Sequence, residues 1–127
     1  MAVERHITQP HAGFAAAVTT SGQGRTIHVS GNVGFGDDGK VVSGGVEAEA
    51  RATFANIEKV LHDAGASMSD VVRISAFLTD LDSYGEYAKV RSEVFGENLP
   101  ASTAVQAAGL LVGAHIEIDA VAFVSEG

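Results

Sequence analysis

The chain has 127 residues, of which 46% are apolar and 19% charged, and this composition indicates one globular domain with its own core. A formal net charge of −8 argues against nucleic-acid binding, which needs clustered lysine and arginine. Cysteine is absent, which excludes disulfides, thiolate nucleophiles and cysteine-based metal sites. The N-terminus lacks the apolar core of a signal peptide, and no run approaches the roughly 20 apolar residues of a membrane helix. We therefore expect a cytoplasmic single domain, residues 1–127, without nucleic-acid or membrane partners.

The N-terminal third predicts three strands followed by a loop. The strand patterns cover residues 2–8, 14–20 and 26–30. Residues 21–24 (Ser-Gly-Gln-Gly) predict a hairpin turn between the second and third strands. Residues 31–45 contain six glycines and form a candidate pocket-forming loop.

Two helices and one strand follow. Residues 46–64 predict the clearest helix, with an apolar stripe of Phe54, Ile57, Val60, Leu61 and Ala64. Residues 71–79 predict a strand with Val72, Ile74, Ala76 and Leu78 on one side and Val71, Arg73, Ser75 and Phe77 on the other. Asp82 or Ser83 can cap a second helix that ends near Phe95, before Gly96 and Pro100.

The last quarter, residues 100–124, predicts two strands joined by a short loop. Residues 115–124 alternate with period two, which puts His115, Glu117 and Asp119 on one face. The element order is β-β-β-α-β-α-β-β. It predicts an α+β fold with one mixed sheet of about six strands and both helices packed on one face.

Glu117 and Asp119 are the best general acid–base candidates, and the alternative is an ordinary solvated strand face. His115 beside Glu117 is the only suggestive ligand pair, and it lacks a compact metal-binding motif. Residues 34–40 match part of a phosphate-binding loop, but Val41 stands where a magnesium-binding Ser or Thr is required. We therefore predict no metal site and no bound cofactor.

Four segments together resemble one known family. They are Ser30-Gly31 with its glycine-bearing loop, residues 71–81 (VVRISAFLTDL), residues 98–101 (NLPA) and residues 116–120 (IEIDA). This combination is similar to the Rid (YjgF) family of reactive intermediate/imine deaminases. The resemblance implies a chorismate-mutase-like fold of the bacillus type and a homotrimer with ligand clefts between subunits. It also implies cofactor-free hydrolysis of imines or enamines to keto acids and ammonia.

The resemblance also implies roles for individual residues. Family members use a glutamate of an I-E-I-E-A motif to activate water and an arginine of a P-A-R-S motif to bind the substrate carboxylate. Glu117 stands at that glutamate and is the expected catalytic residue. The expected substrate-binding residues are Phe14, Gly31, Phe77, Ser102, Thr103 and Asp119. Ser102 stands where the arginine is expected, and a hydroxyl cannot replace a bidentate guanidinium contact of about 1.5–3 kcal/mol.

The missing arginine favours a neutral or more apolar ligand over the usual amino-acid-derived carboxylate. Arg73 and Arg91 are the later arginines, and their positions relative to the cleft stay open at this point. Three hypotheses follow: a diverged Rid-type hydrolase, a non-catalytic trimer that binds a small metabolite, and an endoribonuclease. The acidic net charge argues against the third.

Overall fold

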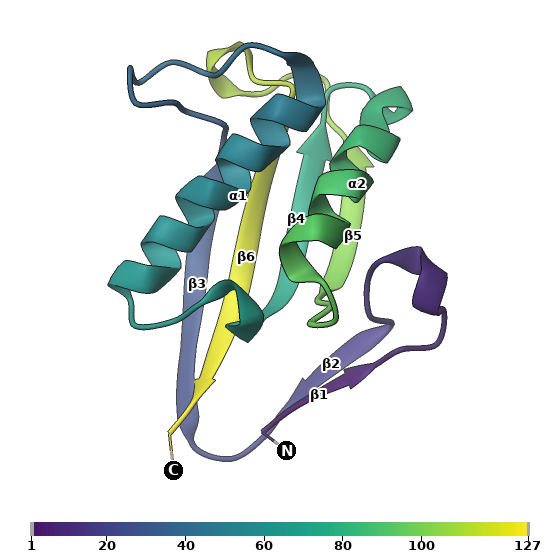
Figure 1. Cartoon of the computed structure of the whole chain (residues 1–127), viewed down its shortest axis with the longest axis vertical. Coiled ribbons are helices and arrows are strands. Elements are labelled where there is room, and N and C mark those ends of the chain that lie inside the picture. Colours follow the sequence, from purple (N-terminus) through teal and green to yellow (C-terminus); the bar gives the residue numbers. More distant parts are fainter. Residues whose placement is uncertain (1, 127) are drawn as a thin grey trace.

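The computed structural model describes residues 2–126 and contains six strands and two helices in the predicted order (Figure 1). The strands are β1 (Val3–His6), β2 (Ala17–Thr20), β3 (Gly24–Asn32), β4 (Val71–Leu78), β5 (Ala101–Gln106) and β6 (Ile116–Ser125). The helices are α1 (Gly45–Asp63) and α2 (Tyr84–Phe95). Neither helix within residues 2–126 is long and apolar enough to cross a bilayer.

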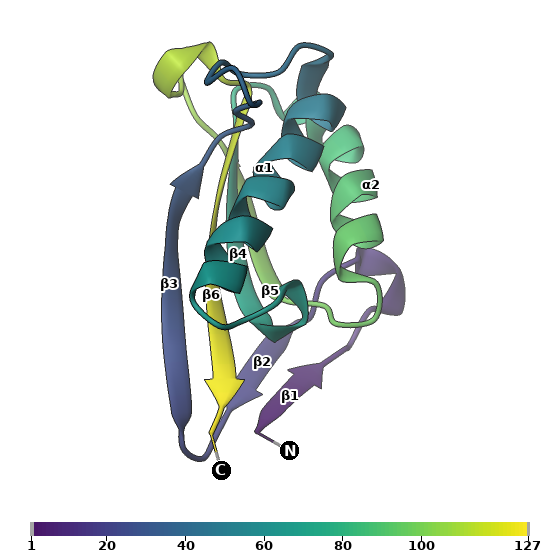
Figure 2. The ribbon, with the colours of Figure 1, turned by 60° about the vertical axis from the view of Figure 1, so that its left-hand side comes forward.

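The main sheet has four strands in the order β3-β6-β4-β5. β4 and β5 are parallel, whereas β6 is antiparallel to both of its neighbours. Both helices pack on one face of this sheet, and no other part of residues 2–126 covers the opposite face (Figure 2). The predicted α+β class is confirmed, as are the six strands and the packing of both helices on one face of a mixed sheet.

The six strands are divided between two sheets, which the sequence did not predict. β1 and β2 form a separate antiparallel pair, so the expected hairpin between the second and third strands is wrong. The backbone N–H of Ala15 donates to the Pro100 carbonyl at 2.9 Å, beside an isolated bridge from Ala15 to Ala101. The guanidinium of Arg5 donates to the carbonyls of Val71 and Leu99. These contacts hold the pair against the main domain.

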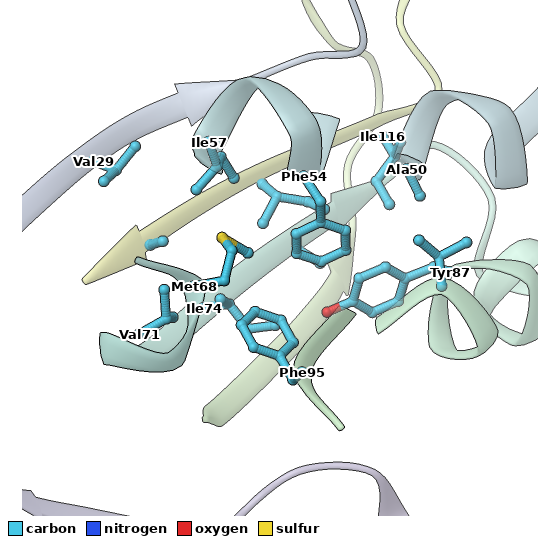
Figure 3. Close-up of a cluster of buried hydrophobic side chains, with 14 of the residues drawn as sticks. Val29, Ala50, Phe54, Ile57, Met68, Val71, Ile74, Tyr87, Phe95 and Ile116 are labelled. Carbon is cyan, nitrogen blue, oxygen red and sulfur yellow. The ribbon is translucent and has the colours of Figure 1, made fainter. Parts of the chain in front are cut away.

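The core lies between the helices and the sheet (Figure 3). The buried side chains of α1 are Val46, Glu49, Ala50, Thr53, Phe54, Ile57 and Leu61. Val60, which we placed on this stripe, is exposed instead. On α2, Tyr87, Val90 and Phe95 are buried, and the Phe54 ring lies edge-on to Phe95 at 5.5 Å. Each large apolar side chain buried here contributes about 1.5–3 kcal/mol.

Helix α2 begins after a short 3₁₀ turn, Leu81–Ser83. Ser83 occupies the N-cap position, but its side chain makes no capping hydrogen bond. The Asp80 carboxylate instead accepts from the N–H of Asp82, so Asp82 is not the cap. Gly96 follows the last helical residue with φ 55°, as the predicted stop requires.

The alternation predicted for β4 fails at its first residues. The pairing of β4 with β6 shifts between Val71 and Arg73, which is a β-bulge. Val71 is therefore buried in the same core as Ile74, although strict alternation put these two residues on opposite faces. From Arg73 onward the predicted faces are correct, since Ile74, Ala76 and Leu78 are buried.

Candidate functional site

Glu117 lines a pocket of about 190 Å³ at one end of the main sheet. The residues that line it come from the end of β3, the loop that follows β3, the 3₁₀ turn Leu111–Gly113 and the start of β6. These segments lie at the same end of the sheet (Figure 1). Its lining consists of Gly31, Asn32, Val33, Phe35, Leu111, Val112 and Glu117. The lining therefore holds one carboxylate, one amide and otherwise glycine or apolar side chains.

Gly31 is the residue that lets the Glu117 carboxylate lie over β3. A Cβ at position 31 would overlap Oε2 of Glu117 and would lie 3.0 Å from its Cδ. The register between β3 and β6 also shifts between Val29 and Asn32, so Gly31 is outside the regular ladder. At an irregularity of this kind one residue of the bulged strand stays out of the ladder pairing.

Residues of β4, β5 and β6 share the uncovered face of the sheet with Glu117. Phe77 pairs with Glu117, and Ser75 pairs with both Asp119 and Thr103. Directly paired residues project from the same face, so Phe77, Asp119, Thr103 and Glu117 lie together. Arg73 is exposed on this face and its Nη2 donates to Oγ1 of Thr103 at 2.9 Å.

The other two predicted residues, Phe14 and Ser102, lie on the helix side of the sheet. Ser102 pairs with the fully buried Ile74 and faces the Tyr87 hydroxyl, at a geometry short of a full hydrogen bond. The Arg91 guanidinium lies 5.3 Å from the centre of the Phe14 ring and 5.2 Å from that of Tyr87. Burial raises the pKa of Tyr87, so its hydroxyl stays neutral.

Arg91 itself is only 2% exposed. It donates to the Ala12 carbonyl at 3.1 Å and to the Tyr84 hydroxyl at 3.0 Å, while its Nε has no hydrogen-bond partner. The surrounding aromatic rings cover the guanidinium. Arg91 therefore fixes the turn before Phe14 onto α2, and its charge is not open to the uncovered face.

The predicted site residues thus form two groups on opposite faces of one sheet. Gly31, Phe77, Thr103, Glu117 and Asp119 belong to the uncovered face, whereas Phe14 and Ser102 lie toward α2. One chain does not bring Glu117 and Ser102 together.

The alternation predicted that His115 shares a face with Glu117, and this prediction is wrong. β6 begins only at Ile116, and His115 turns toward α1. Its Nδ1 and backbone N–H donate to the Glu49 carboxylate at 2.6 and 2.8 Å, and Glu49 is 2% exposed. The sequence contained one indication that Glu49 needs a buried partner, since Glu49 lies on the buried stripe of α1 between Val46 and Thr53. Within residues 2–126, no group of three or more His, Cys, Asp or Glu side chains is arranged to hold a metal ion.

Comparison with known proteins places this fold and site in context. The family model described as Endoribonuclease L-PSP matches residues 5–124. The rat protein named 2-iminobutanoate/2-iminopropanoate deaminase is 38% identical over 99 residues, which are 77% of this chain and 72% of the rat protein. A RutC family protein of Pyrococcus abyssi is 35% identical over 101 residues, 79% of this chain and 80% of the relative.

Solved structures agree with the sequence comparison. A protein of the conserved Rid family from Yersinia pestis superposes with a TM-score of 0.82 at 27% identity, covering 98% of this chain and 100% of that one. A structure from Thermotoga maritima described as a putative endoribonuclease has a TM-score of 0.77 at 30% identity, covering 98% and 99%. The chain therefore belongs to the endoribonuclease L-PSP family, which includes the Rid (YjgF) proteins.

Proposed function

We propose that this protein hydrolyses a small imine or enamine and that Glu117 is the general base. The observation that carries the proposal is the half-buried Glu117 carboxylate, which lines a small pocket beside the irregular backbone of Gly31. The relatives named 2-iminobutanoate/2-iminopropanoate deaminase support this reaction type.

The reaction needs one positioned carboxylate and a water molecule. The carboxylate of Glu117 takes a proton from water as the water oxygen bonds to the imine carbon. The same proton then passes to the nitrogen, which gives a carbinolamine. The carbinolamine hydroxyl next gives its proton to the nitrogen through the same carboxylate as the C–N bond breaks, so a carbonyl compound and ammonia leave and Glu117 is ionised again. An enamine first gains a proton at carbon and loses one from nitrogen to become the imine. No step requires a metal or an organic cofactor.

The charge of the pocket favours a neutral ligand. A substrate carboxylate about 4 Å from Glu117 would be repelled by roughly 4 kcal/mol at an effective dielectric constant of 20. Among residues 2–126, no lysine, arginine or histidine lines the pocket to offset that repulsion. Arg91 is covered by aromatic rings, and Ser102 replaces the arginine expected at its position. Amino-acid-derived carboxylates are therefore the less favourable substrates.

We further propose a homotrimer with the ligand site shared between subunits. The two groups of site residues lie on opposite faces of the sheet, so they can meet only across two copies. Contacts between different surfaces of identical chains close into rings when the rotation allows it. The uncovered sheet face, with Phe77 and Val121 among its half-buried residues, offers apolar area for such a contact. A cytoplasmic location stays a prediction.

The test measures ammonia release from freshly generated imines by the wild type, Glu117→Gln and Glu97→Gln. Glutamine keeps the shape of glutamate but cannot accept the proton, so we expect a loss of about 100-fold or more for Glu117→Gln. Glu97→Gln is the matched control, since Glu97 is an exposed glutamate that does not line the pocket. Equal rates for the wild type and Glu117→Gln would remove Glu117 from the mechanism.

The alternative is a non-catalytic trimer that binds a small metabolite in the same pocket. This alternative is supported if the wild type releases ammonia no faster than buffer does, from imines with and without a carboxylate, while small neutral compounds still bind to the protein. Nuclease activity is disfavoured by the net charge of −8, because phosphate binding needs clustered cations.

A further inference from the structure

Apolar side chains surround the Glu117 pocket without being part of the core. Leu111 is 79% exposed, Val112 is 64% exposed and Phe35 is 41% exposed, and all three line this pocket. We call Phe35, Leu111 and Val112 the apolar rim. Exposed leucine and valine gathered around one carboxylate are unusual on a free surface, because apolar area is normally spread thinly there.

The backbone at the rim is strained. Val112 has φ 55°, and it is the only residue other than glycine with positive φ among residues 2–126. This region is particularly unfavourable for a β-branched side chain. Because Val112 is mostly exposed, burial in the core does not account for the strain. Strain of this kind at a pocket wall indicates that the side chain has a role in the pocket.

We infer that the apolar rim binds the side chain of the substrate, which is a neutral imine carrying a branched aliphatic or aromatic group. The inference rests on the proposed function, in which Glu117 activates water inside the same pocket. In this arrangement the C=N group lies at Glu117 and Asn32. The apolar substituent extends between Leu111 and Val112 on one side and Phe35 on the other. Phe35, Leu111 and Val112 are then specificity-determining residues.

Two variants remove the rim without disturbing the core. Leu111→Ser changes a side chain that is already exposed, and Val112→Gly places glycine at a positive φ that glycine adopts freely. Both variants should keep wild-type thermal stability or, for Val112→Gly, exceed it. Leu81→Ser is the matched control, since Leu81 is an exposed leucine in another 3₁₀ turn that does not line this pocket.

The substrates are aldimines generated by an amine oxidase from a series of primary amines, from ethylamine to isoamylamine and phenethylamine. The wild-type kcat/KM should rise by about fourfold for each methylene that the rim buries. Leu111→Ser and Val112→Gly should flatten this dependence while leaving the rate on the smallest imine within about threefold. Leu81→Ser should behave as wild type. A dependence on chain length that survives in both rim variants would overturn the inference.

Binding provides a readout that does not depend on turnover. Short neutral amides, from acetamide to isovaleramide and phenylacetamide, resemble the imine and its hydrate, and their dissociation constants can be measured by calorimetry or ligand-observed NMR. Affinity should increase with chain length in the wild type and in Glu117→Gln, but not in the rim variants. If the rim variants lose the chain-length dependence of amide affinity while Glu117→Gln hydrolyses imines as fast as the wild type, only the proposed function fails. If Glu117→Gln is inactive but the rim variants bind the amides with the same chain-length dependence as the wild type, only the present inference fails.

A second copy of the chain is the other possible occupant of the rim. Sedimentation of Leu111→Ser and Val112→Gly tests it, since dissociation of the assembly in both variants would make the rim a subunit contact and overturn the inference. We expect both variants to sediment as the wild type does.

Discussion

Gly31 offers the sharpest test of how the site is built. Replacing it with alanine adds one methyl group that overlaps Oε2 of Glu117 and lies 3.0 Å from Cδ. The backbone at position 31 does not require glycine, since its φ is not positive. The whole effect of Gly31→Ala should therefore fall on the position of the Glu117 carboxylate.

The expected magnitudes for stability and activity differ widely. The overlapping atoms belong to the end of a flexible side chain, and an off-rotamer glutamate costs about 0.5–1.5 kcal/mol, so stability should fall by roughly 1 kcal/mol. A displacement of about 1 Å at a reacting group costs on the order of 100-fold in rate. The assay is ammonia release from imines, together with urea denaturation of the same samples.

The control lies on the same strand. A Cβ at Gly24 would overlap the Phe123 ring and lie 2.6 Å from the Val124 carbonyl oxygen, which is backbone and cannot rotate away. Gly24→Ala should therefore lose stability, by about 1–3 kcal/mol, but keep the activity of its folded fraction. The double variant Gly31→Ala/Glu117→Gln should be no slower than Glu117→Gln alone. A wild-type rate for Gly31→Ala, or additive losses in the double variant, would refute the reasoning.

Three further predictions follow from other contacts. Arg91→Met should destabilise the protein by about 2–4 kcal/mol, because the Ala12 carbonyl loses its donor and the aromatic rings lose their cation; hydrogen exchange should accelerate at residues 9–14. Gly85→Ala should stabilise the protein by about 0.5 kcal/mol in urea denaturation, since a Cβ in this first turn of α2 meets nothing within 4 Å. The Arg51 hydrogen bond holds the pKa of Glu93 below its usual 4.5, so their interaction should stabilise the protein fully above that pH and fade as the pH falls through the lower folded pKa. Thermal melts of wild type and Glu93→Gln should accordingly differ at pH 7, converge in acid, and differ less at high salt; a constant difference would contradict this assignment.

The family and its fold class could be predicted from the sequence because both depend on local patterns. Periodicity places the helices and strands to within a few residues, and short segments such as IEIDA at 116–120 carry the resemblance to the Rid proteins. Glu117 could be selected in this way, since its neighbours Ile116 and Ile118 are apolar and the strand alternates. That residue 102 is a serine is likewise read from the sequence, and its standing in place of an arginine is what the resemblance implies.

Tertiary structure decided what those patterns leave open. Strand pairing is made by backbone hydrogen bonds between distant segments, so no local period could indicate that β2 pairs with β1 or that β6 lies between β3 and β4. The bulge between Val71 and Arg73 also depends on the pairing with β6, and it buries Val71 in the core although strict alternation put it on the other face. His115 pairs with Glu49 because α1 packs over the start of β6, which is 66 residues away along the chain. The division of the site residues between two faces of the sheet also depends on register, and it is why Glu117 and Ser102 do not meet within a single chain.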